Sequence, residues 1–244
     1  MLKLEARPQP SPAWTYGSPV LALAVTVLIG VLLFVALGKD PVAGLRVFFW
    51  DPIKSPYALG ELTVKATPLL LIALGLAVCF RSNVWNIGAE GQYVLGAIAA
   101  SGVALLADKG SSSWIVLPVI LAGMLGGMFW AGITAWLRDR FNANEILVSL
   151  MLVYVAVMLL SFIVSGPWKD PQGYNFPQSR TFDAATRIPR LFAGSRVSIG
   201  IFIALAGVAC VWVFLFRTRA GFAQQVGGLA PAAARYAGFS SRRA

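Results

Sequence analysis

The sequence contains no histidine, and this absence excludes several kinds of catalytic site. A Ser-His-Asp triad, an H-E-x-x-H zinc site and a haem held by an axial histidine all need an imidazole side chain. The 244 residues include only two cysteines, Cys79 and Cys210, and each lies inside an apolar run, where a thiol behaves as a small hydrophobic group. We therefore expect no disulfide, no metal site and no cofactor in this chain.

Charged residues are also scarce, at 12% of the chain against roughly 25% in an ordinary globular protein. Hydrophobic residues make up 58%, and the mean hydropathy is +0.74. This composition excludes a soluble enzyme and is typical of a membrane protein. The net charge of +10 comes from basic residues that lie mostly in the joints between apolar runs, so we expect anionic lipid headgroups, not nucleic acid, as the counter-charge.

Five apolar runs are long enough to cross a hydrocarbon core about 30 Å thick as helices. They cover residues 20–38, 62–80, 114–137, 146–165 and 198–216. A sixth run, 92–107, is short and follows a polar stretch, so we interpret 81–107 as one broken element. The runs lack the two-residue alternation of barrel strands. The predicted fold class is therefore all-α: a polytopic membrane helix bundle with about six transmembrane helices, one of them discontinuous.

An even number of crossings places both termini on the same side, and the distribution of Lys and Arg favours the cytoplasm. The basic residues divide evenly between the two sides, but half of the outer ones lie on one long segment, which translocates with less regard to charge. The predicted parts are a cytoplasmic segment 1–19, a transmembrane domain 20–216 with extracytoplasmic segments 39–61 and 166–197, and a cytoplasmic segment 217–244.

The first apolar run has a second interpretation, because basic residues precede it as they do in a signal peptide. Its apolar stretch, Val20–Leu37, is longer than the roughly 7 to 15 residues of a signal-peptide core. We therefore expect a retained membrane helix. The aromatic cluster that begins at Phe48 suits a further helix lying at the membrane interface.

The polar stretch 81–92 holds six candidates for a substrate pathway: Arg81, Asn86, Gly88, Glu90, Gly91 and Gln92. Ionisable groups near the membrane interior usually face a cavity or one another, so Glu90, paired with Arg81, is a candidate by default. Asn86 could cap a helix that starts at Ile87, and the two glycines would let a helix or a ligand approach the backbone. The alternative is an ordinary polar loop with small-residue helix packing.

Two other segments carry helix-end signals. Asn144 is a typical N-cap with Glu145 in the first turn, where the helix dipole stabilises negative charge; capping explains both residues, and contact with a substrate is the alternative. In the tail, Pro231 and Gly238 bracket a short helix over 232–237. A helix below about 12 residues is marginal in water, so this one needs a docking surface, either lipid headgroups or another protein.

The glycines of this chain form no nucleotide-binding loop. No G-x-x-x-x-G-K-[ST] sequence occurs, so the chain has no P-loop for ATP, and any energy for its function must come from a partner or an ion gradient. The group Gly123, Gly126 and Gly127 is explained by close helix packing.

Several stretches together resemble the permease subunits of nucleoside-type ABC importers, within a larger group that also moves simple sugars and branched-chain amino acids. They are Val64–Leu70, Phe80–Arg81, Trp85–Gln92, Asn144–Leu152, Gly166–Pro171, Asn175–Gln178 and Ala232–Gly238. They occur in the family's order from about residue 60 to 239, which is more specific than any single motif.

The resemblance implies a permease subunit of an ATP-driven importer for nucleosides or related sugar-containing solutes in a bacterial cytoplasmic membrane. Its partners would be an ATP-binding cassette subunit that holds the ATP, a second permease subunit and an extracytoplasmic substrate-binding protein facing 166–197. The broken element, Asn144 and Glu145 would line the pathway. The helix that docks on the cassette would be the coupling helix, with residues Pro231, Ala234, Arg235, Tyr236 and Gly238.

The chain departs from the family pattern at three places. Leu229-Ala230-Pro231 stands where the family has Asn-Pro, and Val153 stands where the family has Asn. Relatives continue past the coupling loop with further membrane helices, so we expect a C-terminally truncated permease. The alternative function is accordingly an inactive fragment or scaffold that binds the cassette without transporting.

Overall fold

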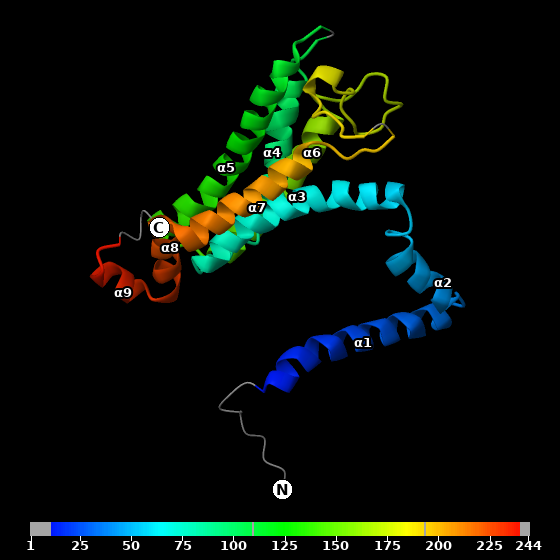
Figure 1. Ribbon diagram of the computed structural model, residues 1–244. Helices are drawn as coiled ribbons and strands as arrows, with labels where there is room; N and C mark the ends of the chain where they lie inside the picture. Colours follow the sequence, from blue (N-terminus) through cyan, green and yellow to red (C-terminus); the bar gives the residue numbers. More distant parts are fainter. Residues whose placement is uncertain (1–10, 109, 193, 240–244) are drawn as a thin grey trace. The chain divides into compact units, whose positions relative to one another are not determined.

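The computed structural model describes residues 11–108, 110–192 and 194–239 (Figure 1). The regular secondary structure of these residues is helical, apart from two isolated antiparallel bridges that join Lys169 to Ser179 and Arg190 to Ser198. The chain divides into two compact units, residues 1–62 and 63–244. The predicted all-α class is confirmed.

Five helices among the described residues are long and apolar enough to cross a membrane. They are α1 (Pro12–Ala36), α3 (Pro56–Arg81), α5 (Val116–Phe141), α6 (Glu145–Ser165) and α7 (Gly200–Arg217). Each covers most of one predicted apolar run, so the five spans predicted from length and hydropathy are confirmed. Many of their large apolar side chains are exposed, as expected of helices that face lipid.

The remaining elements are short. They are α2 (Pro41–Leu45), the π-helical turn η1 (Arg46–Trp50), α4 (Ala89–Ala104), the 3₁₀ turns η2 (Ser113–Ile115) and η3 (Ala184–Thr186), α8 (Arg219–Leu229) and α9 (Pro231–Tyr236). In the first unit α2 packs on α1, because a Cβ at Gly44 would lie 2.6 Å from the ring of Phe34. The aromatic cluster at Phe48 is helical, as predicted.

The predicted broken element is present in the second unit. α3 ends at Arg81, residues 82–88 are not helical, and α4 begins at Ala89. The 16 residues of α4 extend about 24 Å, which is less than a membrane core, so α4 needs the non-helical residues before it to complete a crossing. The predicted cap at Asn86 is wrong: α4 starts two residues later than Ile87, with Gly88 in the N-cap position.

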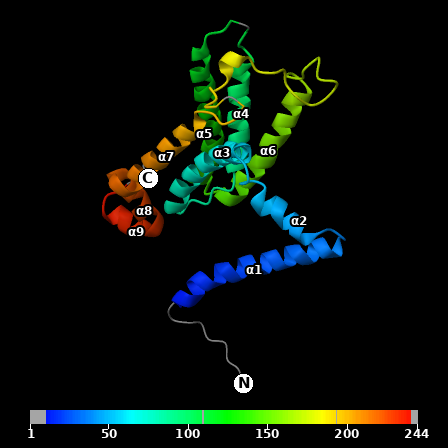
Figure 2. The ribbon, with the colours of Figure 1, turned by 45° about the vertical axis from the view of Figure 1, so that its right-hand side comes forward.

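Small residues set the directions of the central helices. A Cβ at Gly127 would lie 3.3 Å from the carbonyl oxygen of Gln92, and one at Gly96 would lie 2.9 Å from the carbonyl oxygen of Gly123. The paired positions run in opposite directions, so α4 and α5 are antiparallel (Figure 2). The prediction that this glycine group serves helix packing is confirmed.

α3 and α7 run side by side in the same direction (Figures 1 and 2). A Cβ at Gly200 would lie 3.8 Å from the methyl group of Thr67, and one at Gly207 would lie 3.1 Å from a methyl group of Leu74. These contacts are seven residues apart on both helices, which keeps one face of each helix toward the other. Arg81, seven residues further along α3, lies over the ring of Phe216 on α7.

The segments between and after these helices gather at opposite ends of the second unit (Figure 1). The long segment 166–197 contacts the end of α4: Trp168 approaches Gly102, and the guanidinium of Arg180 donates a hydrogen bond to the carbonyl oxygen of Leu105. α8 and α9 lie at the other end, beside the ends of α3 and α7. α9 confirms the predicted short tail helix, whereas α8 was not predicted.

The glycine contacts between α4 and α5 lead to a stability prediction. A Cβ at Gly126 would lie 2.6 Å from the Cβ of Ala99, so we expect Gly126→Ala to lower the free energy of unfolding by about 1 to 3 kcal/mol. Gly132, also on α5, has nothing within 4 Å of its Cβ position, so Gly132→Ala should be neutral or stabilising by up to about 1 kcal/mol. Thermal unfolding in detergent measures both variants, and equal effects would contradict the packing.

Candidate functional site

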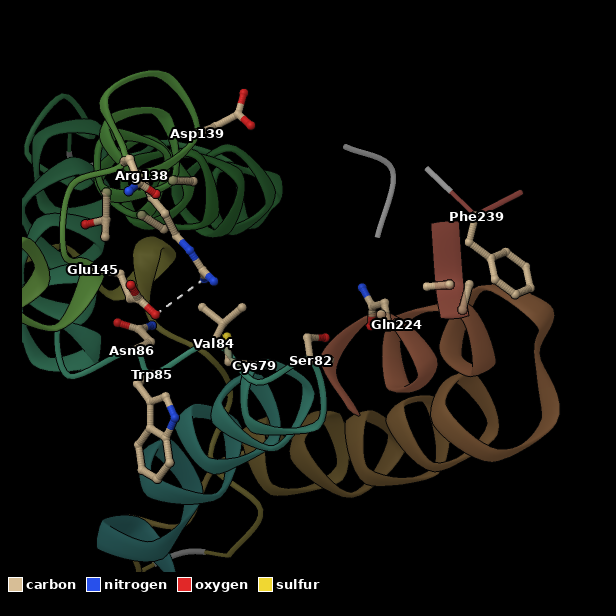
Figure 3. A pocket seen from close by; sticks show the side chains of 18 of the residues that line it. Cys79, Ser82, Val84, Trp85, Asn86, Arg138, Asp139, Glu145, Gln224 and Phe239 are labelled. Carbon is tan, nitrogen blue, oxygen red and sulfur yellow. Dashed lines mark ion pairs between the residues drawn. The ribbon is translucent and has the colours of Figure 1, made fainter. Parts of the chain in front are cut away.

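An open cavity of about 650 Å³ lies at the end of the second unit that carries α8 and α9. Its walls come from the end of α3, residues 82–86, the first turn of α4, the second half of α5, the start of α6, and both α8 and α9. In Figure 3 Arg138, Glu145 and Asn86 lie on one side of it, and Gln224 and Phe239 approach from the other. A cavity of this size at a broken membrane helix is a candidate solute site.

The break begins with a capping motif at the C-terminal end of α3. Asn83 adopts a left-handed conformation, with φ of 53°. Its N–H donates to the carbonyl oxygen of Phe80 at 3.1 Å, and the N–H of Val84 donates to that of Cys79 at 2.9 Å, which together form a Schellman motif. These bonds satisfy the last groups of the helix and turn the chain along the cavity wall.

Two side-chain amides hold the other end of the break. Asn86 and Gln92 exchange a pair of hydrogen bonds, each 3.2 Å long, in which each amide nitrogen donates to the oxygen of the other side chain. The Oδ1 of Asn86 also accepts a hydrogen bond from the N–H of Gly88 at 2.9 Å. The pair therefore joins the non-helical segment to the first turn of α4, and both amides line the cavity.

The two glycines of the signature serve close contact with α6. A Cβ at Gly88 would lie 2.8 Å from the Cβ of Ser149, and one at Gly91 would lie 3.0 Å from the Cα of Val153. Ser149 is 1% exposed, and its hydroxyl accepts a hydrogen bond from the N–H of Ile87 at 3.3 Å. Any larger residue at either glycine would push α4 away from α6.

The α5–α6 corner supplies charge to the cavity. α5 ends at Asn142, a second left-handed asparagine, with φ of 52°. Asn144 caps α6, because its Oδ1 accepts hydrogen bonds from the N–H groups of Ile146 at 2.9 Å and Leu147 at 3.3 Å, which confirms the predicted cap. Arg138 reaches Glu145 at 3.5 Å, so this ion pair neutralises part of the lining (Figure 3).

α8 forms one wall of the cavity and contacts the backbone of the break directly. Thr218 caps it, accepting a hydrogen bond from the N–H of Gly221 at 3.0 Å. A Cβ at Gly228 would lie 2.9 Å from both the carbonyl oxygen of Arg81 and the N–H nitrogen of Asn83. The backbone of α8 therefore rests on the backbone at the start of the break.

α9 is docked on its own chain through one face. Ala234 is 5% exposed, and Phe239, just past the helix, packs edge-on against Phe222 of α8 with ring centroids 6.2 Å apart. Tyr236 on the opposite face is 97% exposed. Gly238 has φ of 80°, the left-handed end expected of a glycine past a helix.

The structure brings some of the predicted site residues to the cavity and leaves others outside it. Those that line it are Asn86, Gln92, Glu145, Ala234 and Arg235. Gly88 and Gly91 lie in the α4–α6 contact, Asn144 is a cap, and Pro231 begins α9. Within the described residues Arg81 and Glu90 do not form the expected pair: Arg81 lies over Phe216, and Glu90 is exposed on α4.

Several lining residues were missed by the sequence analysis. Thr134 and Arg138 lie one helical turn apart on α5 and face the cavity together, a polar stripe in an otherwise apolar run that the sequence displays. Gln224 and Gly227 come from α8. The only sequence signal for α8 is a Thr cap, and its paired glycines argue against a helix.

A family model described as the branched-chain amino acid transport system / permease component matches residues 58–244 of the chain. The chain belongs to this permease family. The match covers all of the second unit, including the broken element and the cavity, and the resemblance found in the sequence is confirmed. Together with five membrane-length helices it identifies a multi-pass membrane protein.

Similar curated proteins are permeases for sugars and nucleosides. A glucose ABC transporter permease protein, TsgB13 of Haloferax volcanii, is 39% identical over 94% of this chain and 63% of its own length. A guanosine ABC transporter permease protein, NupP of Bacillus subtilis, is 28% identical over 92% and 65%. A nucleoside ABC transporter permease protein, NupB of Lactococcus lactis, is 27% identical over 92% and 64%. The chain thus spans somewhat less than two thirds of these relatives, and no solved structure matches it.

The amide pair at the break of this permease leads to a second prediction. Because Asn86 and Gln92 exchange two hydrogen bonds, Asn86→Ala and Gln92→Ala should show a coupling energy of about 1 kcal/mol in a double-mutant cycle of thermal unfolding. The same cycle between Asn86 and the exposed Tyr93 should show none. Independent, additive effects of Asn86 and Gln92 would contradict the pairing.

Proposed function

We propose that this chain is the membrane-spanning permease subunit of an ATP-driven importer for nucleosides or related sugar-containing solutes. The observation that carries the proposal is the broken element, whose unwound residues and amide pair form one wall of a cavity at the end of the membrane helices. Non-helical backbone at such a place is tolerated where it lines a cavity. The relatives named for glucose, guanosine and nucleosides support this class of solute.

We propose that the α8–α9 end faces the cytoplasm of a bacterial cell, with both termini inside. The ends of α3, α5 and α7 all carry arginine in their last turn at this level, which is the asymmetry expected of a cytoplasmic side. The segment 166–197 then lies outside, where a substrate-binding protein would deliver the solute. This assignment also places α9 on the side where ATP is available.

The proposed partners follow from this orientation. A separate ATP-binding cassette subunit would bind and hydrolyse ATP, so the permease itself is not an enzyme, and it would dock on the exposed face of α9. A second permease subunit would complete the pathway, with Glu90, exposed on α4, directed toward the solute between the two halves. Asn86 and Gln92 would exchange their mutual hydrogen bonds for bonds to a polar solute.

Uptake of labelled solute tests the proposal. Membrane vesicles that contain the chain with its cassette, second permease and binding protein should accumulate radiolabelled guanosine or glucose only when ATP is supplied. Glu90→Ala should reduce this uptake at least about tenfold, because the proposed hydrogen bond from the carboxylate to the solute would be lost. Glu90→Gln separates the effect of charge from that of shape. Cassette binding without any uptake would instead support the scaffold alternative.

Docking of the cassette tests the role of α9. Tyr236 is 97% exposed at the centre of the proposed interface, so Tyr236→Ala should weaken co-purification of the cassette about tenfold or more. Tyr174, which is 98% exposed at the opposite end of the unit, is the matched control, and Tyr174→Ala should retain the cassette. Equal loss in both variants, or in neither, would remove α9 from the interface.

A further inference from the structure

Four side chains form a continuous stack where α3 and α7 end. The guanidinium carbon of Arg81 lies 5.4 Å from the ring centroid of Phe216, and the rings of Phe216 and Trp212 lie 6.3 Å apart. The guanidinium carbon of Arg217 lies 5.4 Å from the ring centroid of Trp212. We call these four residues the arginine–aromatic stack. It brings two positive charges from separate helices onto one aromatic surface.

The two arginines of the stack stand at the ends of neighbouring helices. Arg81 is the last residue of α3 and Arg217 is the last residue of α7, and the two helices run side by side in the same direction. Aromatic rings and arginines gather where membrane helices meet the headgroup layer. Both rings are about half exposed, at 50% for Trp212 and 51% for Phe216, so the surface is open to lipid.

Neither arginine belongs to the lining of the cavity, so the proposed transport role does not use this surface. Each guanidinium carbon lies 5.4 Å from its ring centroid, and a guanidinium carries five N–H donors in one plane. The donors that do not face the ring remain for a second ligand. The geometry suits an anion with several oxygens, because such donors bind phosphate in pairs.

We propose that the arginine–aromatic stack binds the phosphate of an anionic phospholipid in the leaflet at the α8–α9 end. Charge complementarity and depth both favour this occupant: the phosphate of a lipid lies at the boundary that the helix ends mark, and the rings would contact its glycerol and upper acyl chain. The net charge of the chain is +10, so an anionic lipid is preferred over a zwitterionic one. This site is independent of whether the permease transports.

Native mass spectrometry of the purified full chain with defined lipids tests the proposal. In detergent micelles containing equal phosphatidylglycerol and phosphatidylcholine, the protein should retain phosphatidylglycerol preferentially. Arg81→Gln combined with Arg217→Gln should reduce that retention at least fivefold. The control is Arg140→Gln combined with Arg219→Gln, which removes the same charge from exposed positions at the same end and should leave retention within twofold.

A second variant keeps both arginines and removes one of the aromatic rings of the stack. Trp212→Leu leaves both arginines in place but removes the ring beneath Arg217, and we expect a twofold to threefold loss of phosphatidylglycerol. Its thermal midpoint reports whether the protein is folded. Unchanged retention in both stack variants, or equal loss in the charge-matched control, would overturn the proposal.

Two further measurements distinguish a bound lipid from a free phosphate or a protein partner. Glycerol phosphate at millimolar concentration should not displace the lipid, and displacement would mean that a free phosphate is the ligand. If the stack variants retain phosphatidylglycerol but lose a co-purified second permease, the surface is a protein interface and the lipid site is wrong.

Discussion

The constraint on which the rest of the second unit depends is the need to satisfy an unwound backbone inside a membrane protein. Residues 82–88 leave the helix directly after α3, and packed helices offer few water molecules to replace the lost helical hydrogen bonds. The N–H groups of Asn83 and Val84 turn back to α3, that of Ile87 reaches Ser149, and that of Gly88 reaches Asn86. Each neighbouring helix is positioned by its part in covering this segment.

Small residues allow that coverage. In lipid, burial of apolar side chains gives helices little reason to associate, so close packing and hydrogen bonds must hold them together. Most of the buried apolar residues are accordingly alanines: Ala156 and Ala204 are both 0% exposed, and Ala104 is 5% exposed. Glycines bring α4 within backbone contact of α5 on one side and of α6 on the other. The large apolar side chains remain on the outside, where lipid solvates them.

The sequence predicts the helices well because span length and hydropathy are imposed by the bilayer itself. It also predicts the Asn144 cap and α9, since both depend on residues within a few positions of one another. The cap at Asn86 was wrong because a local turn to Gly88 competes with helix formation there. Local residues could not reveal this choice, which depends on the contact of Gly88 with α6.

The cavity was less predictable than the helices for the same reason. Its lining combines residues from α3 to α9 that are brought together only by tertiary packing. Arg81 illustrates the limit: its place in a polar stretch suggested Glu90 as a partner, yet the parallel packing of α3 and α7 puts its guanidinium over the ring of Phe216. α8 was missed because two glycines lower its propensity, although they are what lets it fit.

The contact at Gly228 has a mechanical consequence. Because no side chain separates α8 from the backbone of residues 81–83, no rotamer change can absorb a displacement of α8 toward α3. The contact between α8 and residues 81–83 therefore resists a movement of α8 toward α3. A push on α9 toward the cavity would therefore pass through α8 to the backbone beside Ser82, which lines the cavity. A pull would be resisted by other contacts, among them the hydrogen bond from the Gln225 amide to the carbonyl oxygen of Leu215 at 2.6 Å. Displacements of α8 in the two directions would therefore be opposed by different contacts.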